Sequence, residues 1–298
     1  MVDSVKCNSV KRMKLSIITI NYNNVEGLKR TLASVAEQSY RDVEHIIIDG
    51  GSTDGAVDAI KEYVQKVDSR ESKVNRVKWS SEPDKGIYNA MNKGIKKATG
   101  AYIQILNSGD ILAAPNVTER MMNAIYTVHH TPYTENIPDI LYGNMIRKDY
   151  ATGKIDGKSK EVEYSLRQYF ASTMNHDCCY IRRDLFQTYG LYDESLKIVS
   201  DWKWFLLAIG LGNVKPIYVD IDVTIFDCSG ISETNLELRN KERRQVLEEV
   251  LPPAILADYD KYAFPMEQYN RLKKYHLWPI VYFMERVLFK LNKWHILR

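Results

Sequence analysis

Cysteine is scarce in this chain, and its few cysteines lack the spacing of a metal site. There are 4 among 298 residues, namely Cys7, Cys178, Cys179 and Cys228. Zinc sites need closely spaced pairs, and two adjacent cysteines are poorly placed for an ordinary bridge. The sequence therefore argues against zinc or disulfide chemistry and predicts reduced thiols in a cytosolic compartment.

Long apolar runs and an excess of one charge are missing as well. The amino terminus carries Lys6, Lys11 and Arg12 but no apolar run of the kind that forms a signal peptide or a membrane anchor. We therefore expect a cytoplasmic protein with a flexible tail over residues 1–12. A formal net charge of +3 is too near balance to indicate a nucleic acid partner.

Three β-rich apolar runs are present, and each ends in polar residues. The runs are 14–20, 45–48 and 100–106, and the polar segments that follow them are 21–24, 49–54 and 107–110. Helical spacing over 25–39 and 56–66 indicates crossover helices, so the pattern predicts a parallel sheet. Because the carboxyl ends of parallel strands lie side by side, these polar residues would line one crevice. Each segment alone is equally consistent with an ordinary turn or helix cap.

The order of these motifs resembles the inverting glycosyltransferases of family 2, which have a GT-A fold. The matching segments are 16–23, 32–40, 48–55 and 82–94. Each motif alone is weak evidence, whereas their recurrence in the right order over roughly residues 14–230 is specific. The resemblance implies an α/β fold, an αβα sandwich around a mostly parallel central sheet.

The length of the chain suits one elaborated α/β domain with an extension. We expect a GT-A catalytic domain over residues 13–232 and a helical extension over 233–298. Within the catalytic domain, residues 13–112 would form the nucleotide-sugar-binding half and residues 113–232 the acceptor half.

The resemblance assigns the nucleotide to the first two strand ends. Asp49 matches the aspartate that contacts the base in the family, and Tyr22 and Asn23 would pack or hydrogen-bond beside it. Asp54 would touch the base or the ribose, or would simply cap a helix.

A second donor-site segment contains Asp84, Lys85 and Gly86. Asp84 or Lys85 would bind ribose or phosphate, and Gly86 would let the backbone approach the ligand closely. The alternative for Lys85 is an ordinary solvated loop lysine.

The turn after the third run carries the metal prediction. A divalent cation neutralises the charge that builds up on a departing diphosphate, and the family places an aspartate pair or an Asp-x-Asp element here. The turn reads Asn107, Ser108, Gly109, Asp110, so one expected carboxylate is missing. Asp110 is left as the principal ligand of Mn²⁺ or Mg²⁺, with Asn107 and Ser108 as donor-binding residues. The departure also leaves open a metal-free enzyme.

Direct displacement at an anomeric carbon needs a base for the acceptor hydroxyl. Asp201 falls where the resembling family keeps that base, at the start of an apolar helical stretch over 202–209, where it could also cap the helix. His176 lies in a segment that resembles the acceptor side of the family. It would bind acceptor or phosphate, or would be a hydrogen-bonded structural histidine.

The carboxyl-terminal segment 271–298 is basic and amphipathic. It holds seven Lys and Arg residues against one acid, Glu285. On a helical wheel one side is apolar, with Ile280, Met284, Val287, Leu288 and Leu291. This pattern predicts contact with a membrane surface, or else a helix packed on the catalytic domain. The apolar stretch is too interrupted to span a bilayer.

Together these features predict transfer of a sugar from a nucleoside diphosphate donor to a glycan or polyprenol-linked acceptor, with inversion. The expected setting is cell-surface polysaccharide biosynthesis, with the protein peripheral on the cytoplasmic face of a membrane. Two other interpretations remain open. One is a nucleotidyltransferase, which gives Asp201 no obvious role. The other is a catalytically silent glycan- or nucleotide-binding scaffold of the same fold, which the missing carboxylate at Gly109 favours.

Overall fold

The computed structural model describes residues 13–69, 74, 76–128, 137–162, 165–228, 230 and 234–293. The expected tail over residues 1–12 lies outside this part of the chain. The chain divides into two compact units, the first ending at Glu242 and the second beginning at Arg243.

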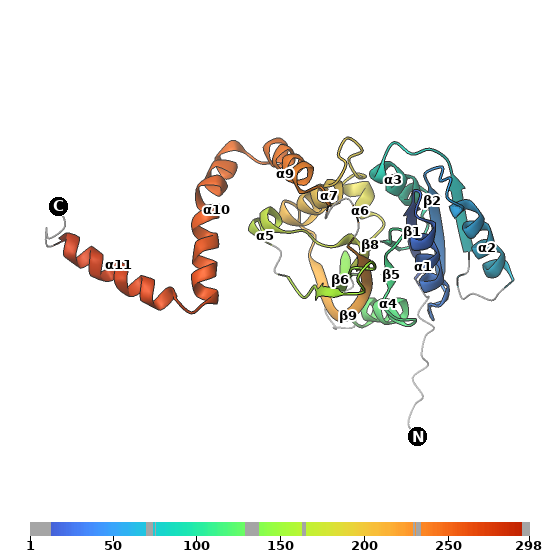
Figure 1. Cartoon of the computed structure of the whole chain (residues 1–298), viewed down its shortest axis with the longest axis horizontal. Coiled ribbons are helices and arrows are strands. Elements are labelled where there is room, and N and C mark those ends of the chain that lie inside the picture. The colour runs from blue at the N-terminus through green and yellow to red at the C-terminus, as the bar shows by residue number, and fades with distance from the viewer. Residues whose placement is uncertain are drawn as a thin grey trace, which may run out of the picture. The chain divides into compact units, whose positions relative to one another are not determined.

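The first unit is built on a single mixed sheet. Its described strands are β1 (Leu15–Asn21), β2 (Val43–Asp49), β3 (Arg76–Ser81), β4 (Tyr102–Ile105), β5 (Ile111–Leu112), β6 (Ile140–Lys148), β7 (Ile155–Lys158), β8 (Cys179–Arg182) and β9 (Pro216–Asp227). They follow the order β3-β2-β1-β4-β8-β6-β9-β5, with β7 paired to β6 (Figure 1). Strands β1 to β4 are parallel to one another, as are β6 and β9, whereas β8 and β5 are antiparallel to their neighbours. The predicted α/β fold with a mostly parallel sheet is confirmed.

Helices lie between these strands, and one more, α9, follows the last strand. They are α1 (Val25–Ala36), α2 (Ala56–Asp68), α3 (Ile87–Lys97), α4 (Val117–Val128), α5 (Leu166–Ala171), α6 (Leu185–Thr188), α7 (Ser200–Phe205) and α9 (Leu236–Val250), together with the 3₁₀ turn η1 (His176–Cys178) and the π-helical turn η2 (Leu206–Gly210). The single helix expected over 202–209 is thus α7 followed by a π turn, and Asp201 lies in its first turn.

The helices cover both faces of the sheet, and side chains alternate between these faces along each strand. Successive strand residues point to opposite faces, so Ile17 and Ile47 join the core that α1, α2 and α4 cover. Ile18 points the other way, toward α3. Gly94 of α3 packs so closely there that an added Cβ would come within 2.3 Å of Ile18 Cγ2.

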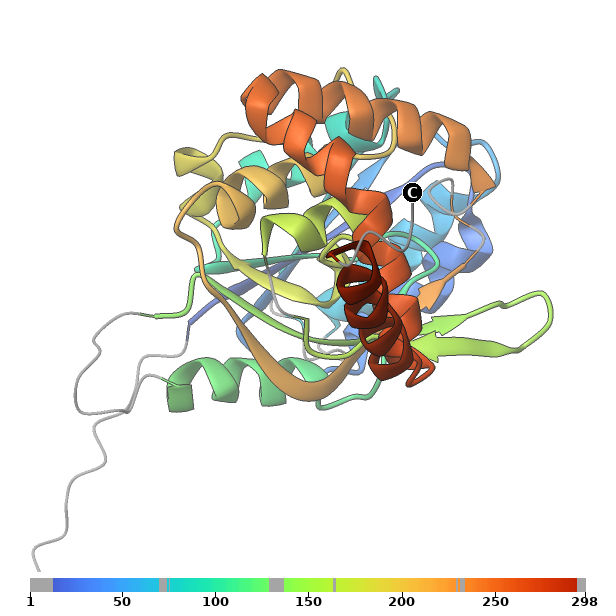
Figure 2. The ribbon, with the colours of Figure 1, turned by 90° about the vertical axis from the view of Figure 1, so that its left-hand side faces the viewer.

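The far half of the sheet is dominated by β9. This 12-residue strand curves beside α4, and the β6–β7 hairpin projects from the same region (Figure 2). Because β9 is parallel to β6, it runs from Pro216, beside the start of β6, to Asp227, beside Lys148. Its carboxyl end reaches the turn that follows β4, which is why the two halves of the sheet share one site.

The first unit continues past residue 232, where we expected the catalytic domain to end. The reason is Glu242 of α9, whose buried carboxylate accepts the backbone N–H groups of Lys197 (2.8 Å) and Ile198 (2.9 Å). This part of α9 therefore packs on the loop before α7. The functional boundary between catalytic domain and extension stays a prediction.

The second unit contains α10 (Pro253–Lys274) and α11 (Trp278–Lys293). Large apolar side chains on α11 are exposed, namely Ile280, Tyr282, Phe283, Met284, Val287 and Leu288. In the described part of the chain, no helix has the length and apolar character needed to cross a membrane.

Candidate active site

The carboxyl ends of β1, β2 and β3 lie side by side. Asn21 is the register partner of Asp49, and Asp49 is the register partner of Ser81. Asn21 Nδ2 donates to Asp49 Oδ1 (2.8 Å), and the Ser81 hydroxyl donates to Asp49 Oδ2 (2.6 Å). The polar residues that follow separate runs in the sequence are thereby brought to one edge.

Asp49 is completely enclosed at this edge. Its carboxylate also accepts the N–H groups of Gly51 and Ser52 and the Ser52 hydroxyl. Burial alone would raise the pKa of Asp49, but the hydrogen bonds outweigh it and lower that pKa. Asp49 therefore holds the loop that follows β2, and its contact with a base stays a prediction.

Tyr22 and Asp84 approach this loop from two sides. A Cβ added at Gly50 would lie 3.1 Å from Tyr22 Cδ2 and 3.2 Å from Asp84 Oδ2. The Tyr22 ring is 69% exposed, so one face of it is open to a ligand. Asp84 is paired with Lys93 (2.6 Å). These two predicted donor residues share one small region.

The other predicted donor residues differ in their surroundings. Asn23 Oδ1 accepts the Thr53 N–H (2.9 Å). Asp54 accepts the N–H of Val25 at the start of α1 (2.7 Å) and that of Ala56 at the start of α2 (3.2 Å). These bonds are what we expect if Asp54 caps helices, the alternative to its contact with the base or ribose. Both carboxylate oxygens of Asp54 are thus engaged by helix starts.

Lys85 and Gly86 form the approach to α3. Lys85 is exposed, and its backbone N–H donates to Asn89 Oδ1 (3.2 Å). Gly86 has a φ of +131°, and an added Cβ would meet nothing within 4 Å. This backbone conformation favours glycine, and it leaves open space above the loop.

Thr31 of α1 fixes the turn that contains Asn107 and Ser108. Its hydroxyl donates to the Asp110 carbonyl (2.7 Å) and accepts the Gly109 N–H (3.0 Å). Asn24 Nδ2 donates to the Ser108 carbonyl (3.1 Å). The turn is therefore held rigidly against the start of α1, which sequence reasoning missed.

Asp110 lies among other carboxylates. It is 3% exposed, and its Oδ1 accepts the Asp227 N–H (2.9 Å). Burial and the negative charge of Asp177 raise the pKa of Asp110 well above its usual range. Asp177 is also buried, and burial raises its pKa, while its Oδ2 accepts the Thr224 hydroxyl.

Asp227 takes the space beside Gly109. Gly109 has a φ of +111°, and a Cβ there would lie 3.3 Å from Asp227 Oδ2. The Asp227 carboxylate is ion-paired with Arg30 at 3.2 Å. The position where the family has a carboxylate is therefore adjacent to another carboxylate, contributed by β9.

Asp201 is held by two partners. Tyr88 O–H lies 2.8 Å from Asp201 Oδ1, and His176 Nδ1 lies 3.0 Å from Oδ2. Burial alone would raise the pKa of Asp201, but the bonds from His176 and Tyr88 lower it. Asp201 is therefore ionised at neutral pH, and its side chain remains 15% exposed.

His176 links Asp201 to the turn after β4. Burial alone would lower the pKa of His176, but the bond to Asp201 and the nearby carboxylates raise it to about 9. Its Nε2 lies 3.2 Å from Asn107 Nδ2, while Asn107 Oδ1 is buried without a hydrogen-bond partner in the described structure. A half-turn of the Asn107 amide would give a protonated His176 an acceptor and satisfy that oxygen.

Residues 16–190 match the family described as Glycosyl transferase family 2. The chain belongs to this family. An uncharacterized glycosyltransferase of Mycobacterium tuberculosis is 30% identical over 220 residues, which cover 73% of this chain and 76% of that protein. A PGL/p-HBAD biosynthesis glycosyltransferase of Mycobacterium bovis is 27% identical over 220 residues, which cover 74% of this chain and 79% of that protein.

Two solved structures share the fold. S. aureus TarS 1-349 in complex with UDP-GlcNAc superposes with a TM-score of 0.59 at 19% identity, covering 79% of this chain and 64% of that one. The mannosyltransferase PcManGT from Pyrobaculum calidifontis, in complex with GDP-Man and Mn²⁺, gives a TM-score of 0.57 at 17% identity and covers 80% of this chain and 64% of that one. Family 2 membership and the GT-A fold expected from the sequence are therefore confirmed.

The residues of this family 2 chain offer a divalent cation only part of a site. Among the described residues, no group of three or more His, Cys, Asp and Glu side chains is arranged to hold a metal ion. However, Mg²⁺ usually needs only one or two carboxylates and takes its other ligands from phosphate and water. The like charges that raise the pKa of Asp110 are also those that a cation would relieve. The site fits a cation that arrives with the donor diphosphate and binds Asp110.

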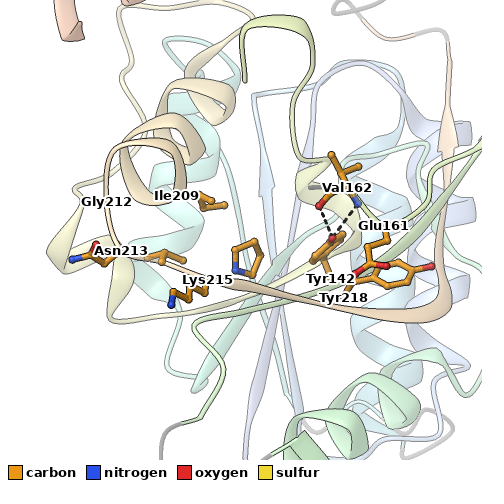
Figure 3. Close-up of a pocket in the computed structure, with 10 residues that line it drawn as sticks. Tyr142, Glu161, Val162, Ile209, Gly212, Asn213, Lys215 and Tyr218 are labelled. Atoms are coloured by element: carbon orange, nitrogen blue, oxygen red, sulfur yellow. Dashed lines mark hydrogen bonds between the residues drawn. The ribbon is translucent and has the colours of Figure 1, made fainter. Parts of the chain in front are cut away.

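A separate cavity of about 370 Å³ opens in the expected acceptor half (Figure 3). Tyr142 of β6 and Tyr218 of β9 line it, with ring centroids 5.4 Å apart, and Glu161 and Lys215 lie at its edges. None of the site residues predicted from the sequence lines this cavity. Its walls come from the first halves of β6 and β9, from the end of η2 with the segment 212–215, and from residues 161–162, so it is distinct from the site at the carboxyl ends of the strands.

Sequence reasoning also missed four residues that hold the site together, namely Thr31, Tyr88, Asp227 and Glu242. Tyr88 and Asp227 both belong to segments that resemble the family. Tyr88 lies inside the segment 82–94, two residues after Gly86. Asp227 lies in the segment 226–232, which resembles a Gly-Gly-Ile-Ser loop of the family with Ser229 in place of the first glycine, and part of this segment lies outside the described residues. A search for side chains that flank the donor motifs would have found both.

Proposed function

We propose that this chain transfers a sugar from a nucleoside-diphosphate-sugar to an acceptor hydroxyl, with inversion at the anomeric carbon. The observation that carries the proposal is Asp201, an ionised and partly exposed carboxylate. It is bonded by Tyr88, from the segment expected to bind the donor, and by His176, from the segment expected to face the acceptor. In a direct displacement, the acceptor oxygen forms a bond to the anomeric carbon on the face opposite the leaving group. The bond from that carbon to the diphosphate oxygen breaks, and its electron pair leaves with the nucleoside diphosphate.

Asp201 would take the proton of the acceptor hydroxyl. Tyr88 and His176 each engage one carboxylate oxygen, and each oxygen has a second lone pair that is left for the incoming hydroxyl. An ionised base at neutral pH is what this step requires. The low pKa of Asp201 limits its strength as a base, so the geometry of the acceptor contact carries much of the catalytic effect.

The donor would lie across the strand ends. We place the base near Tyr22 and the loop held by Asp49, the ribose near Asp84, and the diphosphate above Asn107 and Ser108. This arrangement is supported by the open Tyr22 ring and by the space above Gly86. It follows the ordinary use of strand ends in open α/β sheets.

We propose Mn²⁺ or Mg²⁺ as the cofactor, with Asp110 as the protein ligand. The cation supplies charge neutralisation for the departing diphosphate. His176, whose pKa is about 9, would carry a positive charge toward the same diphosphate or toward the acceptor. A cation beside Asp110 would favour the ionised form of that buried carboxylate and would offset the negative charge of the donor diphosphate.

The acceptor would be a glycan or a polyprenol-linked glycan in cell-surface polysaccharide biosynthesis. One relative is named a PGL/p-HBAD biosynthesis glycosyltransferase, which supports a biosynthetic role for this chain as well. We also propose that α11 contacts the cytoplasmic face of an anionic membrane. Its exposed apolar side chains and the basic residues Arg271, Lys273 and Lys274 at the end of α10 support that partner.

The first test identifies the donor. Nucleoside diphosphates, each with and without Mn²⁺ or Mg²⁺, are screened by thermal shift, because a selective ligand raises the apparent melting temperature by mass action. We expect one nucleotide to act, and to act more strongly with the cation. The anomeric configuration of the product, followed by NMR with the matching sugar nucleotide, then tests inversion directly.

The second test is Asp201→Asn. This variant should bind the donor with unchanged affinity in calorimetry but lose about 10²- to 10⁴-fold in transfer rate, the usual contribution of a general base. Full transfer by the variant would remove Asp201 as the base. Donor binding without any transfer by the native chain would favour the silent scaffold, and release of pyrophosphate from a nucleoside triphosphate would favour a nucleotidyltransferase.

A further inference from the structure

Tyr88 lies between the donor loop and Asp201. It is the second residue of α3, directly after the loop 84–86, and its side chain is 5% exposed. Its hydroxyl oxygen lies 2.8 Å from Asp201 Oδ1 and 2.6 Å from the carbonyl oxygen of Ile198. A single side chain thus connects the segment expected to hold the donor with the segment expected to activate the acceptor.

The Tyr88 hydroxyl has one proton and faces two acceptors. While Asp201 is ionised, Tyr88 donates to the carboxylate. Once Asp201 has taken up the acceptor proton on its other lone pair, the carboxyl group is neutral and a weaker acceptor, and the Ile198 carbonyl is available to the Tyr88 proton. Burial and the charge of Asp201 raise the pKa of Tyr88 well above its usual value, so Tyr88 keeps its proton in both states.

The Ile198 carbonyl is itself held in position. Glu242 accepts the N–H groups of Lys197 and Ile198, so the peptide that receives the second Tyr88 bond is anchored from α9. A buried hydrogen-bonding group that is left without a partner destabilises the folded state. Each position of the Tyr88 proton therefore has an acceptor that other hydrogen bonds hold in place.

Other titratable groups surround the Asp201 carboxylate. His176 of η1 faces its Oδ2, and the charges of Asp177 and Asp110 act on the pair through His176. Tyr192 lies behind Tyr88, with ring centroids 5.6 Å apart. The Tyr192 hydroxyl is buried and has no hydrogen-bond partner in the described structure, so only the Tyr88 phenol bonds the carboxylate.

We propose that Tyr88 is a positioning residue for the transfer reaction, one that holds the Asp201 carboxylate through both of its protonation states and ties it to the donor loop 84–86. The inference rests on the proposed role of Asp201 as the base. It also couples donor binding to the base. Tyr88 follows the loop 84–86 by two residues, so a shift of that loop on donor binding would shift the Tyr88 hydroxyl that bonds Asp201.

The experiment compares Tyr88→Phe with Tyr192→Phe in the full-length chain. Each removes one buried phenolic hydroxyl from neighbouring rings, but only Tyr88 bonds Asp201. For Tyr88→Phe we expect kcat to fall about 10-fold, with an unchanged KM and calorimetric Kd for the donor. We also expect the acid limb of kcat/KM to move up by about one to two pH units, because the ionised carboxylate loses a donor. Tyr192→Phe should match the native profile.

A merely structural role would lower the melting temperature without moving the pH profile. An unchanged kcat and acid limb in folded Tyr88→Phe would therefore overturn the inference. If that variant fails to fold, 3-fluorotyrosine is incorporated at position 88, which keeps both contacts but makes the phenol a stronger donor. It should then lower kcat several-fold, whereas the same replacement at position 192 is silent. Equal effects at the two positions would also overturn the inference.

Asp201→Asn, measured alongside, separates the two proposals. If Asp201→Asn is inactive while Tyr88→Phe behaves as native, only the Tyr88 inference fails. If Asp201→Asn retains full transfer, the base assignment fails whatever Tyr88→Phe does.

Discussion

The ion pair between His176 and Asp201 is the central feature of the site at the scale of single residues. His176 Nδ1 lies 3.0 Å from Asp201 Oδ2, and both side chains are 15% exposed. Each partner favours the charged form of the other, so the pKa of His176 is raised and that of Asp201 is lowered. A pair of this kind stabilises the fold only while both members are charged.

The pair predicts a loss of stability at alkaline pH. The pKa of His176 is about 9 in the folded chain, above the ordinary value of 6.5 that it takes in the unfolded chain, so its contribution to stability is fully present below pH 6.5 and is lost as the pH rises through 9. Over that interval we expect the free energy of unfolding to fall by about 1–3 kcal/mol. Urea denaturation at several pH values measures it.

His176→Gln serves as the control for this pH dependence. It keeps a hydrogen-bonding side chain next to Asp201 but removes the group that titrates. The native chain should lose stability between pH 6.5 and 9.5 and the variant should lose less. Parallel curves for the two proteins would mean that His176 is not charged in the folded state.

At the scale of secondary-structure elements, the turn between β4 and β5 lacks a carboxylate of the family motif, and strand β9 places a different carboxylate, that of Asp227, beside it. Gly109 stands where the family has a carboxylate, its φ is +111°, and the space beside it is occupied by Asp227. A side chain at this position would strain the backbone and press on the carboxylate that pairs with Arg30. Glycine at position 109 therefore suits both the backbone conformation of the turn and the close approach of Asp227 from β9.

Gly109→Ala should therefore destabilise the chain by about 1–3 kcal/mol and weaken binding of the nucleotide with its cation. Gly153→Ala is the matched control, because Gly153 also has a positive φ, of +72°, but an added Cβ there meets nothing within 4 Å. Chemical denaturation and calorimetric titration with the nucleotide measure both effects. Equal losses in the two variants would show that contact with Asp227 is unimportant.

At the scale of the whole molecule, the second unit differs from the first in what it exposes. Phe283 is 68% exposed and Met284 is 57% exposed on α11, next to a basic end of α10. An exposed apolar face flanked by basic residues suits the surface of an anionic bilayer, into which such a face inserts by a few ångströms. Membrane contact would bring the enzyme to a lipid-linked acceptor.

The full-length protein should sediment with phosphatidylglycerol vesicles, less with phosphatidylcholine vesicles, and less again at high salt. Phe283→Glu should weaken this binding several-fold. Ile155→Glu is the control, since Ile155 of β7 in the first unit is also exposed, at 64%. If both variants bind as the native chain does, α11 is not the membrane contact, and the packed-helix alternative gains support.

Much of the fold was predictable from the sequence because its signals are local. Each apolar run ended within one residue of the end of its strand, β1, β2 or β4, and helical spacing located α1 and α2. The main difference, the π turn after α7, carries no local signal, because Leu206 to Gly210 reads as ordinary apolar helix. Strand order beyond β4 also depends on pairings between distant segments, which periodicity does not encode.

The site divides in the same way. Its carboxylates at positions 49, 110 and 201 could be named from the sequence because each sits in a motif at the end of a strand or the start of a helix. What bonds each of them could not be named. Asp201 and Tyr88 are 113 residues apart, and Asp110 and Asp227 are 117 apart. Which carboxylate is ionised follows from those partners and from burial.

By itself, the sequence determined the family, the fold class and the edge of the sheet at which the polar residues gather, because those follow from short-range pattern and motif order. Only the tertiary structure decided that Asp227 lies beside Gly109, that the bond to Asp201 raises the pKa of His176, and that Tyr88, next to the loop 84–86, bonds Asp201. Charge and hydrogen bonding depend on distance in space, and folding alone brings these residues within a few ångströms of one another.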